Sequence, residues 1–209
     1  MPRLAAAAVL WFGLWLPPLR SGLESNMALH MTVQIPLLAM VGVLIAPEVR
    51  RFEPRWLAEA DWLGIPGLVL VLFSTSYWML PLALDSAIGD WRMELAKFLS
   101  LPLLVGLPLA LSWQRMPVLG RLFVIANMIS KVGALGGLYL AAPIRLCAYY
   151  GLDQQAEAGW ALLMIAGVAV LGIFLVSFFG WSWRQPFWKG RNRNRPAATA
   201  TDLGSSLPT

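Results

Sequence analysis

The sequence predicts an all-α fold, a polytopic membrane helix bundle of about six transmembrane helices, or five if the first is a cleaved signal. Of the 209 residues, 58% are hydrophobic and only 13% are charged, about half the charged share of a soluble domain. The mean hydropathy is +0.65. The apolar residues also fall in runs that approach or reach the roughly 20 residues of helix that a bilayer core requires. Lipid is therefore the expected solvent.

Six apolar runs define the expected helices, in the order 4–19, 27–46, 63–84, 98–113, 122–143 and 158–179. None alternates polar and apolar residues as a barrel strand would. Tryptophan prefers the membrane interface, and six tryptophans lie at or near the ends of these runs: Trp78, Trp91, Trp113, Trp160, Trp181 and Trp183.

The first run leaves two alternatives open. It is short, follows Arg3 and ends at Pro17-Pro18, which is compatible with a secretory signal peptide. No small-residue cleavage pattern follows Leu16, and this favours a retained helix. The orientation of the later spans is the same in both cases.

Basic residues set the expected orientation, because cytoplasmic flanks retain Lys and Arg. The predicted inner side carries Arg3, Arg50, Arg51, Arg55, Arg115, Arg121, Arg184, Lys189, Arg191, Arg193 and Arg195, and the outer side only Arg20, Arg92, Lys97 and Arg145. The C-terminus is therefore expected in the cytoplasm. We divide the chain into a transmembrane bundle, 1–183, and a basic, then polar, disordered tail, 184–209.

The composition also excludes several functions. One Cys and one His rule out an internal disulfide framework, a CxxC zinc site and an HExxH protease. No nucleophile with a base, carboxylate pair within a span or phosphate-binding loop is visible, so we do not expect an enzyme. The basic residues form short clusters between apolar runs, which argues against nucleic acid as a partner. Membrane lipids are the expected surroundings.

The single histidine lies between two methionines at the start of the second run. Met27 and Met31 are four residues apart and His30 is three from Met27, so the three side chains lie together on a helix. Imidazole with thioethers favours Cu(I). The alternative is a hydrogen-bonded histidine beside gap-filling methionines. Other soft or acidic residues are expected near the same face: Met79, Met93, Cys147, Asp85, Asp90, Asp153 and Glu157.

The segment 25–46, with Met27, His30-Met31 and Pro36-Leu37-Leu38, resembles the signature helix of the CtaG-type cytochrome c oxidase assembly factors. A second stretch at the start of the last span is similar to that family's final helix: Asp153-Gln154-Gln155, then Ala158-Gly159 and Met164. The resemblance covers roughly residues 10 to 180. Asn26 stands where the family pattern has its first histidine, and 90–93 replaces a further histidine.

The resemblance implies a bacterial cytoplasmic (inner) membrane protein that assists assembly of, or copper delivery to, a haem-copper oxidase at the periplasmic face. Its membrane protein partner would be a respiratory oxidase subunit. Only His30, with Met27 and Met31, carries over as a ligand set for Cu(I). It also implies that Asp153, Gln154 and Gln155 face the same pocket, whereas helix capping is the simpler physical interpretation of these three residues.

Lys131 lies about 13 Å into the fifth run, and Asn127 is one turn earlier on the same face. An intramembrane lysine is a functional candidate by default, although it can also snorkel or bond carbonyls inside the bundle. Gly133 and Gly137 form a GxxxG pair on which another helix could pack. We therefore expect this span to be central.

Two further functions remain as alternatives. The first is a structural or accessory subunit that binds no metal and holds a respiratory partner through Lys131 and the Gly133/Gly137 face. The second is a small transporter, which the missing repeat and the scarcity of intramembrane charges make the weaker hypothesis.

Overall fold

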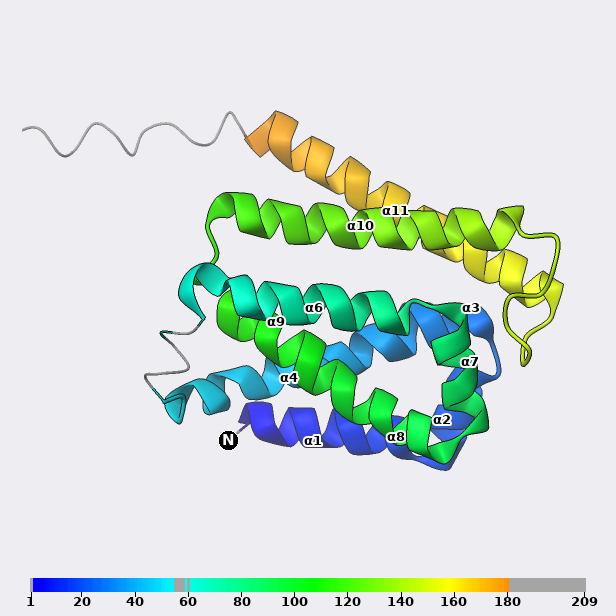
Figure 1. The fold of residues 1–209 in the computed structure, drawn as a ribbon, viewed down its shortest axis with the longest axis horizontal. Coiled ribbons are helices and arrows are strands. Elements are labelled where there is room, and N and C mark those ends of the chain that lie inside the picture. The colour runs from blue at the N-terminus through cyan, green and yellow to red at the C-terminus, as the bar shows by residue number, and fades with distance from the viewer. Residues whose placement is uncertain (1, 55–58, 60, 181–209) are drawn as a thin grey trace, which may run out of the picture. The chain divides into compact units, whose positions relative to one another are not determined.

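A computed structural model describes residues 2–54, 59 and 61–180 (Figure 1). The structure is 85% helical, with no strand among the described residues, which confirms the all-α bundle. Residues Met1–Val170 form one compact unit, and Leu171–Thr209 a second. Trp181, Trp183 and the predicted tail, 184–209, lie outside the described residues.

The helices follow the predicted order. They are α1 (Pro2–Trp15), α2 (Pro17–Glu24), α3 (Met27–Leu29), the π-helix η1 (His30–Gln34), α4 (Ile35–Arg51), the 3₁₀-helix η2 (Trp62–Gly64), α6 (Ile65–Trp78), α7 (Pro81–Gly89), α8 (Trp91–Ser100), the π-helix η3 (Leu101–Gly106), α9 (Leu107–Ser112), α10 (Val118–Ala141) and α11 (Leu152–Gly180).

Four continuous helical segments among the described residues are long and apolar enough to cross a membrane: Met27–Arg51, Trp91–Ser112, Val118–Ala141 and Leu152–Phe178. Two bent pairs, α1 with α2 and α6 with α7, raise the number to six if each pair is one span. The bends measure 68° and 70°. Each follows from proline, because Pro17 and Pro81 start the second helix of the pair and cannot donate a backbone hydrogen bond. The helices indicate a membrane protein.

The centre of the bundle is a close crossing of two helical segments, α4 and η3. A Cβ atom at Gly42 would collide with the Pro102 carbonyl oxygen, and one at Gly106 with the Ala39 carbonyl oxygen. Only glycine allows the two backbones to approach this closely. Around the crossing pack Leu38 and Leu101, both almost fully buried.

The first predicted span is part of this core. Leu14 of α1 is 1% exposed, and the Trp11 indole donates a hydrogen bond of 3.1 Å to the Phe98 carbonyl oxygen on α8. The Trp15 ring packs edge-on against the Phe98 ring.

The prediction that the fifth span is central is wrong. Only 11% of the most apolar stretch of α10 is buried, against 39% for the spans that contain α4 and α9. The predicted glycine pair is also displaced by one residue. A Cβ at Gly137 would meet nothing within 4 Å, whereas one at Gly136 would lie 2.9 Å from the Gly159 carbonyl oxygen on α11. Gly136 and Gly159 therefore form the close contact between these helices. A Cβ at Gly133 would lie 3.7 Å from the Ala166 Cβ, an ordinary van der Waals contact.

Candidate functional site

Charged and polar side chains meet near the junction of α2 and α3, two helices that lie at one end of the bundle (Figure 1). They come from three elements: α2, the π-helix η1 and α8. We call them the polar cluster: Arg20, Glu24, His30, Gln34, Glu94 and Lys97.

Glu24 is the hub of the polar cluster. Its Oε1 accepts from Lys97 Nζ at 2.8 Å and from Gln34 Nε2 at 3.1 Å, while its Oε2 pairs with Arg20 Nε at 3.3 Å. Arg20 also forms an ion pair with Glu94. Two carboxylates thus balance two cations, as buried charges require. Lys97 is 0% exposed.

The chain builds this site through a cap and a widened turn. Asn26 caps α3, since its side-chain oxygen accepts from the Leu29 N–H at 3.1 Å. Its amide also donates to Glu157 Oε2 at 3.4 Å. The π-helix η1 then begins at His30, and the Ile35 N–H bonds the His30 carbonyl, five residues back. Single π-turns inside α-helices are frequent at functional sites.

His30 is the member of the polar cluster in which both side-chain nitrogens are left without a hydrogen bond. Its side chain is fully buried, and within the described residues neither Nδ1 nor Nε2 makes a hydrogen bond. Gln34 is the neighbour placed to share a hydrogen bond with the imidazole, but its Oε1 is also buried without a partner among the described residues, because the two groups do not meet in hydrogen-bonding geometry. Met27 and Met31, at 1% and 7% exposed, are buried with it. The structure therefore encloses all three predicted ligands in the core.

The connection between α10 and α11, residues 142–151, closes over the polar cluster. The Tyr150 hydroxyl donates to the Glu24 carbonyl oxygen at 2.8 Å, and its ring centroid is 6.5 Å from that of His30. Burial, followed by the Glu24 charge, raises the pKa of Tyr150, so this phenol stays a neutral donor.

The predicted Asp153-Gln154-Gln155 stretch holds this connection in place. Gln155 is buried, accepts from the Leu146 N–H at 2.8 Å and donates to the Tyr139 carbonyl oxygen at 3.1 Å. Gln154 donates to the Ser25 carbonyl oxygen at 3.4 Å, beside the polar cluster. Asp153 is exposed in the first turn of α11, where its charge favours the helix dipole. The Gln155 side chain therefore binds the 142–151 connection and the end of α10, and not the residues of the polar cluster.

The other soft and acidic residues expected near this face have structural partners. The Cys147 Sγ lies 3.9 Å from the Pro81 carbonyl oxygen, and burial with the nearby Asp85 carboxylate raises the pKa of the thiol to about 11. Such a thiol stays protonated at neutral pH and is a poor metal ligand. Asp85 itself accepts from the N–H groups of Ala148 and Tyr149. Among the described residues, no three His, Cys, Asp or Glu side chains gather around a possible metal ion.

Lys131 has its partners inside the bundle. Its Nζ donates to the Leu72 carbonyl oxygen at 2.9 Å and to Thr75 Oγ1 at 3.1 Å, both on α6. Bonding to carbonyls inside the bundle was one of the alternatives that the sequence offered for this lysine. The Asn127 Oδ1 is buried with no hydrogen bond to the described residues.

Most residues of the polar cluster were not predicted from the sequence. Starting the fourth span at residue 98 left Glu94 and Lys97 in a loop, but α8 begins at Trp91, so both charges belong to the apolar helical segment Trp91–Ser112. Asp90 caps α8 by accepting from the Arg92 N–H at 2.9 Å, and this cap was the available signal. Trp78, the last residue of α6, is 3% exposed and its indole N–H donates to Ser100 Oγ at 2.8 Å, so its donor is satisfied by the protein.

Comparison of the chain with protein-family models, with curated proteins and with solved structures finds no significant match.

Proposed function

We propose that this chain is a membrane assembly factor that carries Cu(I) on His30, Met27 and Met31 and passes it to a haem-copper oxidase. The observation that supports it best is the buried His30 imidazole, which has no hydrogen bond within the described residues and lies within three residues of two buried methionines on the same helical segment. A buried polar atom without a partner costs about 1–3 kcal/mol, and binding a ligand relieves that cost.

The donor set fits Cu(I). Imidazole and thioether ligands select this ion over harder divalent metals, and methionine sulfur adapts to irregular pockets. The carboxylates of the polar cluster are already matched to Arg20 and Lys97, so they are not surplus ligands for calcium or magnesium. Copper is here a cargo that must be released to the oxidase. A site of only three ligands suits such a transient role.

The copper proposal is tested by anaerobic competition titration of the purified protein with a chromogenic Cu(I) chelator. We expect one Cu(I) per chain in the wild type, and loss of at least tenfold in affinity in both His30→Leu and Met27→Leu/Met31→Leu. Met164→Leu is the matched control, because Met164 is 66% exposed. X-ray absorption should show mixed nitrogen and sulfur ligation. Unchanged affinity in His30→Leu would remove the metal site.

The oxidase role rests on the resemblance of segments 25–46 and 153–164 to the CtaG-type factors. It is tested by oxidase activity and copper content of membranes from a deletion strain, complemented with wild type or His30→Leu. Under our proposal, His30→Leu fails to restore the activity, and added copper compensates in part. Full restoration by His30→Leu would favour the metal-free accessory subunit. A normal oxidase with reduced copper uptake would favour a transporter.

A further inference from the structure

A cavity of about 540 Å³ lies at the other end of the bundle from the polar cluster, between α1, α4 and α9. Two arginines line it, Arg3 from the first turn of α1 and Arg50 from the last turn of α4. The rest of the wall is apolar except for Gln114, with Val43, Leu44 and Pro47 on one side. The volume is in the range of small-molecule sites.

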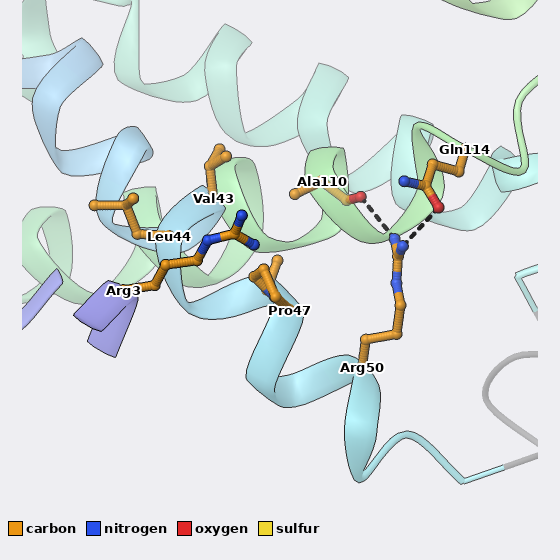
Figure 2. A pocket seen from close by; sticks show the side chains of 8 residues that line it. Arg3, Val43, Leu44, Pro47, Arg50, Ala110 and Gln114 are labelled. Atoms are coloured by element: carbon orange, nitrogen blue, oxygen red, sulfur yellow. Dashed lines mark hydrogen bonds between the residues drawn. The ribbon is translucent and has the colours of Figure 1, made fainter. Parts of the chain in front are cut away.

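The two guanidinium groups differ in how they are held. Figure 2 shows Arg50 extending toward Ala110 and Gln114, where it donates to Gln114 Oε1 at 2.7 Å and to the Ala110 and Leu111 carbonyl oxygens at 3.0 Å. These bonds fix the group at the end of α9 and use three of its five N–H donors. Two donors remain for a ligand.

Arg3 is the complementary half. Its side chain extends from α1 past Leu44 toward Pro47 (Figure 2). Within the described residues it forms no hydrogen bond or ion pair. Among the residues that the structure describes, a fixed cation and an unpaired one therefore line the same cavity, and no carboxylate lines its wall.

We propose that this cavity binds an anionic phospholipid, with its phosphate between Arg3 and Arg50 and its acyl chain against Val43 and Leu44. Guanidinium is the side chain best suited to bind phosphate oxygens in a bidentate manner. The cavity lies at the ends of membrane spans, the level at which lipid headgroups lie. Its combination of two cations with an apolar wall matches an amphiphile with one anionic end better than it matches a soluble anion.

The experiment is native mass spectrometry of the purified full chain in detergent, titrated with phosphatidylglycerol or with phosphatidylcholine. We expect the wild type to retain one phosphatidylglycerol selectively. Since a basic residue at an anionic membrane surface is worth a factor of about five in affinity, Arg3→Gln should weaken retention about fivefold and Arg3→Gln/Arg50→Gln about 25-fold. Arg3→Gln leaves every hydrogen bond of Arg50 in place, so it remains informative if the double variant does not fold.

Two controls separate a built site from general charge attraction. Arg51 pairs with Glu48, is 71% exposed and does not line the cavity, so Arg51→Gln should retain lipid as the wild type does. Val43→Trp fills the apolar wall without changing charge and should abolish retention. Equal losses in Arg51→Gln, or normal retention in Val43→Trp, would overturn the proposal. Displacement of the lipid by millimolar inorganic phosphate would identify a free phosphate site instead.

Discussion

The buried pair of Lys97 and Glu24 gives a quantitative test of the polar cluster. At 2.8 Å and an effective dielectric constant of about 20, the gross attraction is about 6 kcal/mol, and the Arg20–Glu24 pair at 3.3 Å adds about 5 kcal/mol. Desolvation offsets much of both values, so the consequence of a substitution depends on which charge loses its partner.

Replacing Lys97 with Met leaves Glu24 with Arg20 and Gln34 only. Breaking a buried pair by removing one partner costs about 3–5 kcal/mol, and because two partners remain we expect the low end, about 3 kcal/mol. The double variant Lys97→Met/Glu24→Gln removes both charges. Its free energy of unfolding should lie within about 1 kcal/mol of the wild-type value. The coupling free energy between the two sites is then about 2 kcal/mol or more.

The assay is reversible unfolding in mixed detergent micelles, followed by tryptophan fluorescence. Arg51→Met is the matched control, since Arg51 is 71% exposed in its pair with Glu48 and should change the unfolding free energy by less than about 0.5 kcal/mol. A loss below about 1 kcal/mol in Lys97→Met would refute the reasoning. So would a double variant whose loss equals the sum of the single losses.

Three further predictions use the same unfolding assay or a labelling rate. Gly42→Ala should destabilise the fold by about 1–3 kcal/mol, because the new Cβ would meet the backbone of the crossing helix. Gly137→Ala has open space around it and should be neutral or stabilise by up to about 1 kcal/mol. Equal effects of the two substitutions would contradict the close crossing. Cys147 has a pKa of about 11, so at pH 7.5 it should react with iodoacetamide at least 100-fold more slowly than a thiol of ordinary pKa near 8.5. Its reaction rate should rise as the pH increases toward 11. A fast reaction at neutral pH would refute the burial of this thiol. Lys131→Met, which removes two hydrogen bonds to α6, should lower the free energy of unfolding by about 1–2 kcal/mol. If the proposed oxidase partner copurifies with the wild type, it should copurify equally with Lys131→Met; its loss at full stability would restore Lys131 as a partner contact.

The fold was predictable because it depends on a property that the sequence carries locally, the length of apolar runs. The six predicted spans correspond to the four continuous helical segments and the two bent pairs. Even the bends coincide with Pro17 and Pro81, whose effect is local.

The candidate site was predictable only in part, because it depends on contacts between distant segments. The sequence pointed to His30 and its methionines, which are neighbours along one helix. It could not show that Lys97 rather than Lys131 is the fully buried lysine, since that depends on Glu24, 73 residues away. Defining spans by their apolar runs also leaves out charged residues at helix ends, and this placed Lys97 in a loop.

The two π-turns explain why a helical wheel could not have found the arrangement. His30 and Gly42 are 12 residues apart, as are Glu94 and Gly106, which on an uninterrupted α-helix places each pair about 120° apart. A π-turn accommodates one extra residue, and the bonds Ile35 N–H to His30 and Leu107 N–H to Pro102 mark one in each segment. With that residue removed from the count, each pair lies within about 20°. His30 and Gly42 therefore face one side of their segment, and Glu94 and Gly106 face one side of theirs. Each segment thus presents a residue of the polar cluster on the side where α4 and η3 cross.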